Sequence, residues 1–132
     1  MSEGSCGVLV IEDEAVLRFM LTAVLDDEGF DVRAAANGRE GLQILARWQP
    51  AIIVLDFHMP VMDGPAFCAE QHRSPALADI PVLLVSAATD LKRQATTLET
   101  AGSIAKPYDV DELIEAVNQI LATERTARPT YP

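Results

Sequence analysis

Short apolar runs that end in a polar residue recur along this chain. Each run is rich in β-branched residues and is too short for a typical helix. They are residues 8–11 before Glu12 and Asp13, residues 52–55 before Asp56, residues 82–85 before Ser86, and the shorter pair 104–105 before Lys106. Uninterrupted apolar runs of this kind are typical of strands that are buried on both faces of a sheet.

Segments with apolar residues at helical spacing alternate with these runs. Residues 15–28 carry Val16, Phe19, Met20, Ala23 and Val24 at helical spacing, and Gly29 suits the end of a helix. A weak strand is predicted over residues 31–35 and a short one between Gly102 and Lys106. Further helices are predicted over residues 38–48, 65–72, 91–100 and 109–122, the last with a D-x-x-E start that resembles a capping box.

Regular alternation of strands and helices predicts a parallel sheet with helices on both faces. The fold class is therefore α/β, a doubly wound (βα)5 flavodoxin-like three-layer sandwich, with strand order 2-1-3-4-5. We expect one domain over residues 1–122. Residues 123–132 are polar, contain two prolines and lack periodicity, so they are predicted to be a disordered tail or the start of a linker.

Composition narrows the choice of partners. The chain has 132 residues, 49% of them hydrophobic, and a formal net charge of −10. This charge repels phosphate backbones and anionic lipids, so we expect neither direct nucleic-acid binding nor membrane binding. Cys6 and Cys68 do not form a C-x-x-C pair and are predicted to be free thiols. The first residues lack the features of a signal peptide and no apolar run approaches a membrane span, so a cytoplasmic location is expected.

The polar strand ends predict a chemical site. Ligands bind outside the carboxyl ends of strands in an open α/β sheet, where Asp13 and Asp56 would face each other. Carboxylates held together are costly unless a cation lies between them, and Mg²⁺ is the natural occupant. Asp56 could then attack a phosphorus atom, while Mg²⁺, Lys106 and the Ser86 hydroxyl stabilise the phosphoryl oxygens.

Four segments carry a resemblance to a known family. They are residues 10–14 (VIEDE), residues 55–64 (LDFHMPVMDG), residues 85–87 (VSA) and residues 106–108 (KPY). The D-x-x-M-P-x-M-D-G pattern is highly specific, and the other segments follow in the right order. Over residues 6–122 the chain resembles the receiver domain of bacterial two-component response regulators.

The resemblance implies a role for each matching acidic position. Asp56 would be the phosphoacceptor and would also ligate Mg²⁺. Asp13 would be a direct Mg²⁺ ligand, Glu12 a ligand through water, and the backbone carbonyl of His58 a third protein ligand.

The resemblance also assigns the remaining polar strand ends. Ser86 would be the switch hydroxyl that follows the phosphoryl group, and Lys106 the ammonium that pairs with it. Pro107 would follow Lys106 in a cis peptide link. The implied function is phosphorelay signalling: the chain takes a phosphoryl group from a histidine kinase or a phosphotransfer protein and signals by protein contact. It would catalyse its own phosphorylation and dephosphorylation without being a dedicated enzyme.

The chain departs from the family pattern at several positions. Ser103 lies where the family commonly has an aromatic switch residue, three positions before the lysine. Switching is therefore expected to depend mainly on Ser86 and the loop after it. Tyr108 lies where the family often has Phe, and we expect it to pack. His58 and Ala88 occupy variable positions beside the phosphoryl site, and His58 is expected to cover the pocket.

Other functions remain open at this point. A flavodoxin-like cofactor binder would need a phosphate-binding loop where Glu12 and Asp13 stand. A phosphohydrolase with an Asp nucleophile commonly has a second Asp where His58 stands. The chain could also be a receiver-like interaction module that is not regulated by phosphorylation, or a receiver fragment of a hybrid kinase or a longer regulator.

Overall fold

Five strands and five helices alternate along the chain in the computed structural model, which describes residues 6–87, 89 and 91–127. The strands are β1 (Gly7–Ile11), β2 (Asp31–Ala35), β3 (Ile52–Asp56), β4 (Val82–Ala87) and β5 (Gly102–Lys106). The helices are α1 (Ala15–Asp27), α2 (Gly38–Leu45), α3 (Gly64–Arg73), α4 (Leu91–Thr97) and α5 (Val110–Ala127).

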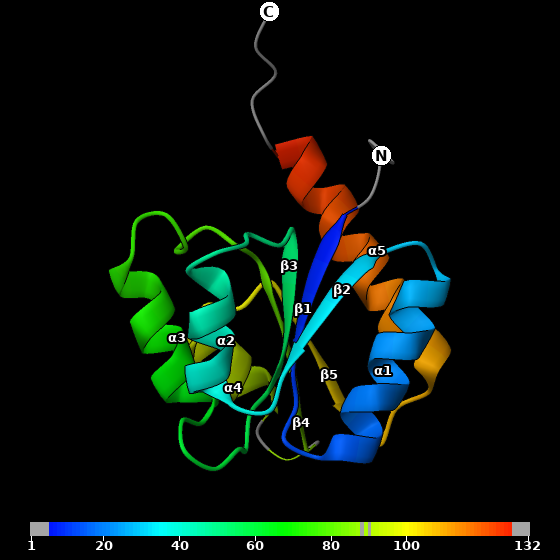
Figure 1. Ribbon diagram of the computed structural model, residues 1–132, viewed down its shortest axis with the longest axis horizontal. Helices are drawn as coiled ribbons and strands as arrows, with labels where there is room; N and C mark the ends of the chain where they lie inside the picture. The colour runs from blue at the N-terminus through cyan, green and yellow to red at the C-terminus, as the bar shows by residue number, and fades with distance from the viewer. Residues whose placement is uncertain (1–5, 88, 90, 128–132) are drawn as a thin grey trace, which may run out of the picture.

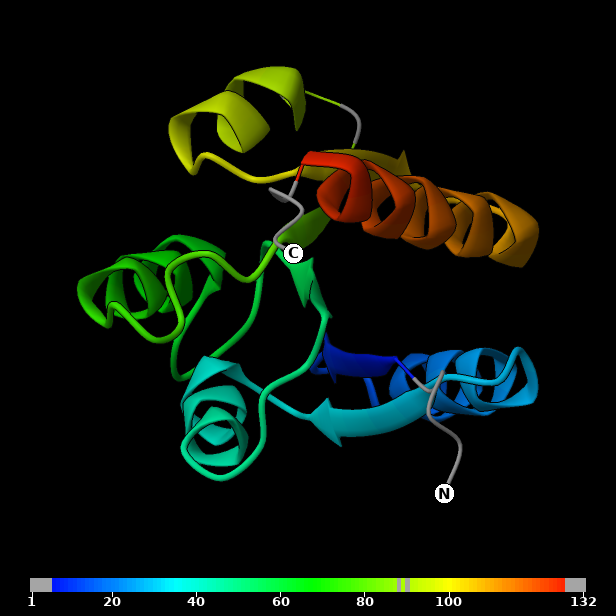
Figure 2. The ribbon, with the colours of Figure 1, turned by 90° about the horizontal axis from the view of Figure 1, so that it is seen from above.

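The strands form one parallel sheet in the order β2-β1-β3-β4-β5, as predicted. Helices α1 and α5 cover one face, and α2, α3 and α4 cover the other (Figures 1 and 2). Because the strands are parallel, their carboxyl ends share one edge, which is the lower edge of the sheet in Figure 1. The predicted α/β three-layer sandwich is therefore confirmed.

Alternate residues of the central strands fill two apolar cores. Leu9, Ile53 and Leu84 pack with Phe67 on the face covered by α2, α3 and α4. The neighbouring strand residues pack with the buried side chains of α1 and α5 on the other face. A strand that is apolar at every position is the sequence signature of burial on both faces. The pattern therefore identified the central strands correctly.

Local capping explains where two of the helices begin. The side chain of Asn37 accepts a hydrogen bond from the Glu40 backbone N–H at 2.9 Å at the start of α2. The Asp63 side chain does the same for the Ala66 N–H at 3.0 Å at the start of α3. Short polar residues at these positions satisfy N–H groups that have no partner within the helix.

Several helix ends differ from the sequence prediction. Helix α2 ends at Leu45 instead of residue 48. Helix α4 ends at Thr97 instead of residue 100, because Glu99 adopts a left-handed conformation with φ of 57°. Helix α5 continues to Ala127, so the first five residues of the predicted tail are helical. No proline or glycine interrupts the chain between residues 123 and 127, and the rest of the predicted tail, residues 128–132, lies outside the described residues.

The buried face of α1 is not the series of apolar residues that predicted the helix. Leu21 and Leu25 are buried, whereas Val16 and Phe19 are 79% and 77% exposed. Met20 is also exposed. Apolar residues surround most of this helix, so their spacing predicts a helix without showing which side faces the sheet.

Candidate functional site

Three carboxylates meet at the carboxyl edge of the sheet. Each of Glu12, Asp13 and Asp56 offers an oxygen, and these oxygens all lie within 4.8 Å of one another. Glu12 and Asp13 follow β1, Asp56 ends β3, and these two strands are neighbours. Glu12 and Asp56 are buried and Asp13 is exposed. The structure thus brings together the three acidic side chains that the sequence predicted at one site.

Backbone contacts hold the β1–α1 loop in place. Oε2 of Glu12 accepts a hydrogen bond from the Glu14 N–H at 3.0 Å. The guanidinium of Arg18, on α1, donates to the backbone carbonyls of Glu12 at 2.8 Å and Asp13 at 3.3 Å. Arg18 is not among the site residues predicted from the sequence. The sequence feature that could have identified it is a long basic side chain one turn into the helix that follows Glu12 and Asp13.

Burial and mutual repulsion raise the pKa values of the buried carboxyls. The pKa of Glu12 is raised to about 7, mainly by burial. The hydrogen bond from the Glu14 N–H lowers this pKa, and the negative charge of Asp56 raises it further. Burial also raises the pKa of Asp56, although its hydrogen bond to Lys106 opposes the change. Oxygen ligands with this much uncompensated charge fit a hard divalent cation, which would favour their charged forms.

Lys106 supplies the positive charge of the site. Its Nζ lies 3.0 Å from Oδ1 of Asp56, and the side chains are 36% and 4% exposed respectively. Burial lowers the pKa of Lys106, but the hydrogen bond and charge of Asp56 outweigh it, so this pKa lies above its ordinary value. The peptide link from Lys106 to Pro107 is cis, as the family resemblance implied.

Ser86 contributes a hydroxyl that has no partner within the protein. It lies on β4, directly after the residue that pairs with Asp56 in the sheet. Its Oγ is buried and forms no hydrogen bond within the described part of the chain. A buried hydroxyl without a partner is costly, so an oxygen of a bound ligand would be a favourable neighbour here.

The loop after β3 is tightly turned. The Gly64 N–H donates to the Phe57 carbonyl at 2.9 Å, and the Met62 N–H donates to the Pro60 carbonyl at 2.7 Å. Val61, inside that second turn, has a φ of 70°, which is strained for a β-branched residue. His58 is exposed, and its ring lies edge-on to Phe57 with centroids 4.7 Å apart. Ligation by the His58 carbonyl stays a prediction, and Ala88 lies outside the described residues.

Ser103 and Tyr108, which differ from the common family pattern near β5, have different surroundings. Ser103 pairs with Leu84 in the sheet and is half-buried. Tyr108 packs against the core between the sheet and helices α1 and α5, so its expected packing role is confirmed. Its hydroxyl, however, is buried without a hydrogen-bond partner among the described residues.

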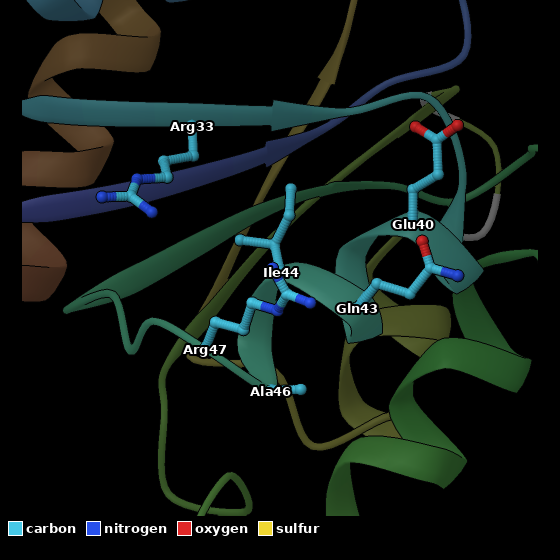
Figure 3. A pocket seen from close by; sticks show the side chains of 6 residues that line it. All are labelled: Arg33, Glu40, Gln43, Ile44, Ala46 and Arg47. Atoms are coloured by element: carbon cyan, nitrogen blue, oxygen red, sulfur yellow. The ribbon is translucent and has the colours of Figure 1, made fainter.

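A hollow of about 720 Å³ lies apart from this site, between β2 and α2 (Figure 3). Arg33 comes from β2, and the other lining side chains come from α2 and the residues directly after it. The guanidinium of Arg33 lies 4.5 Å from the centre of the Trp48 ring. None of the predicted site residues lines this hollow, so we place the function at the carboxylate cluster.

Comparison with known proteins supports the fold and identifies the family. The family model of the response regulator receiver domain matches residues 8–118. The chain belongs to this family and is a receiver domain of two-component signalling. It is 36% identical over 116 residues to "Probable transcriptional regulator ycf27" of Porphyridium aerugineum, covering 86% of this chain and 47% of that protein.

Two further proteins illustrate the range of relatives. Sporulation initiation phosphotransferase F of Bacillus subtilis is 27% identical, and the match covers 86% of this chain and 92% of that protein. The receiver domain of a signal transduction histidine kinase from Syntrophus aciditrophicus is 28% identical with a TM-score of 0.82, covering 97% of this chain and 98% of that one.

The chain spans about half the length of the first curated relatives that it matches. One of them, a DNA-binding dual master transcriptional regulator of Synechocystis, is 29% identical, and this chain spans 48% of it. The expected lack of nucleic-acid binding is therefore not supported by the relatives and stays a prediction. Within the part of the chain that the structure describes, no helix is both long and apolar enough to cross a membrane.

Proposed function

We propose that this receiver domain is an Mg²⁺-dependent switch that accepts a phosphoryl group on Asp56. The donor is a phosphohistidine of a kinase or a phosphotransfer protein. The observation that carries the proposal is the surroundings of Asp56, which has oxygens of two further carboxylates within 4.8 Å and the ammonium of Lys106 at 3.0 Å. A buried carboxylate in such a position is suited to nucleophilic attack on phosphorus.

The transfer can be written with the residues of this chain. An oxygen of Asp56 forms a bond to phosphorus as the bond from phosphorus to the histidine nitrogen breaks, and the electron pair stays on that nitrogen. Lys106 would shift from Asp56 toward a phosphoryl oxygen. The unpartnered Ser86 hydroxyl would donate a hydrogen bond to another phosphoryl oxygen.

Mg²⁺ would be held by Asp13, Asp56 and the backbone carbonyl of His58. Glu12 would bind the ion through a water molecule. When bound, the ion would neutralise the carboxylates and stabilise charge on the transferring group. Attack of water on phosphorus would later break the bond to Asp56 and release inorganic phosphate. The domain would therefore catalyse its own phosphorylation and dephosphorylation, and it would signal through contact with a downstream protein.

The exposed apolar residues of α1 support a protein donor. Val16, Phe19 and Met20 lie in the first half of the helix that begins directly after the acidic loop. Exposed apolar side chains that lie together are typical of protein interaction sites. A donor protein bound there would lie beside Asp13. Phe19→Ser should slow transfer from a phosphotransfer protein and leave phosphorylation by acetyl phosphate unchanged.

Intact-mass measurement after treatment with acetyl phosphate and Mg²⁺ tests the phosphoacceptor. The wild-type protein should gain the mass of one phosphoryl group, and Asp56→Asn should gain none. Asp26→Asn, which changes an exposed carboxylate on α1, is the matched control and should behave like the wild type. Phosphorylation of Asp56→Asn at the wild-type rate would contradict the assignment. A wild-type protein that takes up no phosphoryl group would favour the unregulated interaction module.

A further inference from the structure

Arg18, on α1, contacts the loop that carries two of the three carboxylates of the metal pocket. We propose that Arg18 is a positioning residue: its guanidinium restrains the two peptide links on either side of Asp13 and so directs the Asp13 carboxylate toward Asp56. This inference rests on the Mg²⁺-dependent function proposed above. In this role Arg18 supports the cation site without touching the cation.

One nitrogen of Arg18 binds two successive backbone carbonyls. Its Nη1 donates to the Glu12 carbonyl at 2.8 Å and to the Asp13 carbonyl at 3.3 Å. Because each peptide link is planar, a bound carbonyl restrains the orientation of the whole link. The two links meet at the Cα atom of Asp13, and their planes together set the direction of its side chain. Arg18 therefore controls where the Asp13 carboxylate points.

A second contact of the loop shows which peptide link depends most on Arg18. The Glu14 N–H, which belongs to the same link as the Asp13 carbonyl, donates to Oε2 of Glu12 at 3.0 Å. That bond restrains the link after Asp13. The link before Asp13 is restrained by the shorter of the two bonds from Arg18. Arg18 is half-buried and Asp13 is exposed, so without this bond the carboxylate would be free to turn toward solvent and away from Asp56.

The charge of Arg18 acts against the effect of its geometry. Among the described residues, its guanidinium binds carbonyl oxygens and forms no ion pair with a carboxylate, so the acidic oxygens stay available to a cation. A positive charge beside the pocket repels Mg²⁺. Charge alone therefore predicts that removing the guanidinium tightens Mg²⁺ binding, whereas positioning predicts that its removal weakens binding. The sign of one measurement distinguishes the two roles.

Arg18→Met keeps a long unbranched side chain, removes the guanidinium and is the direct test. Calorimetric titration with Mg²⁺ should show binding weakened about tenfold, within the range expected when a residue that orients a metal ligand is removed. Arg18→Lys keeps the charge and a donor, and its affinity should lie between those of Arg18→Met and the wild type. Arg39→Met is the matched control, because it removes one exposed positive charge from the first turn of α2, which begins at the same edge of the sheet. Its Mg²⁺ affinity should equal or slightly exceed that of the wild type.

A measurement on the unmodified protein gives a second readout that does not depend on any variant. NMR of ¹⁵N-labelled guanidinium groups reports how fast the Nη protons of each arginine exchange with water. Those of Arg18 should exchange more slowly than those of the exposed Arg39. Equal exchange at the two side chains, or unchanged or tighter Mg²⁺ binding by a folded Arg18→Met, would overturn this inference alone. A wild-type protein that binds no Mg²⁺ would overturn the proposed function as well.

Discussion

The central strand β3 and the edge strand β5 supply the two halves of one ion pair in very different settings. Every residue of β3 is buried, and the strand pairs with β1 on one side and β4 on the other. Every residue of β5 is only half-buried, and this strand pairs with β4 alone. Asp56 ends the first strand and Lys106 ends the second.

The difference indicates which partner can move. Asp56 is fixed by a fully packed strand, whereas Lys106 is carried by a strand of mostly small residues at the edge of the sheet. A hollow of about 320 Å³ is lined by Gly102 and Ser103 of β5 and by side chains of α5. Regions with few buried apolar contacts open at the lowest free energy. We therefore expect phosphorylation to change β5 and the loop after Ser86 more than β3.

The largest expected difference concerns stability. Leu55→Ala in β3 should lower the free energy of unfolding by about 2–5 kcal/mol, because it leaves a cavity in a fully buried site. Ile104→Ala in β5 should cost about 1–2 kcal/mol, because its side chain is only partly buried. Denaturant unfolding of both variants checks this, and equal losses would show that the edge strand is as tightly packed as the centre.

Breaking the ion pair should give an asymmetric result. Lys106→Met leaves the buried Asp56 without its cation and should lower the free energy of unfolding by about 1–3 kcal/mol near neutral pH. Asp56→Asn removes one of three like charges and leaves an ammonium that can reach solvent, so stability should stay level or rise. Chemical denaturation without Mg²⁺ measures the free energy of unfolding of both variants. Similar losses of stability in the two would contradict the view that Asp56 is fixed and Lys106 can move.

Mg²⁺ should stabilise the folded domain by an intermediate amount. Free Mg²⁺ at ten times its dissociation constant would add about 1.4 kcal/mol to the free energy of unfolding. Asp13→Asn should lose most of this gain, because the variant removes one of the converging carboxylates. Thermal melts with and without Mg²⁺ provide the measurement. Equal Mg²⁺ stabilisation of the wild type and the variant would rule out Asp13 as a ligand.

The same pocket predicts a pH dependence with a definite sign. The pKa of Glu12 is raised from 4.5 to about 7 in the folded protein, so the folded state holds a proton that the unfolded state has released. Without Mg²⁺, stability should therefore fall as the pH rises through this interval. Glu12→Gln should show a weaker fall, and saturating Mg²⁺ should suppress it. A wild-type curve that rises over this interval relative to Glu12→Gln would contradict the assigned sign.

The smallest effect is expected at the end of α5. Where burial is described, through residue 124, the buried side chains that pack α5 against the sheet are Leu113, Val117 and Ile120, which precede residue 122. A chain that ends at Ala122 should therefore lose less than about 1 kcal/mol, although it removes the last turn of the helix. The melting temperature checks this. A loss of cooperative unfolding would show that residues 123–132 pack against the domain.

The sequence predicted the sheet and the acidic site well because both depend on the same local signal. A buried parallel strand must be apolar throughout, and the polar residue that ends it must lie at the shared edge. That signal placed Glu12, Asp13 and Asp56 together before any contact was known. Ser86 and Lys106 were located in the same way.

Contacts between distant or differently oriented groups could not be predicted in this way. Helix α1 is apolar on several sides, so the periodicity did not reveal that Phe19 is exposed and Leu21 is buried. The buried state of the Tyr108 hydroxyl depends on a core whose buried residues come from three separate strands and two helices. The length of α5 was underestimated because polar residues can extend a helix that is already anchored by its apolar stripe.

The pairing of β1 with β3 has a consequence for how the domain folds. These strands are neighbours in the sheet but are separated in sequence by α1, β2 and α2, and such non-local pairing slows folding. Asp13 and Asp56 are far apart in the unfolded chain, so their repulsion arises only once the two strands have joined. If this pairing forms late, Mg²⁺ will slow unfolding and leave the refolding rate unchanged; if it belongs to the folding nucleus, Mg²⁺ will speed refolding. The metal site can therefore serve as a kinetic probe of when the centre of the sheet assembles.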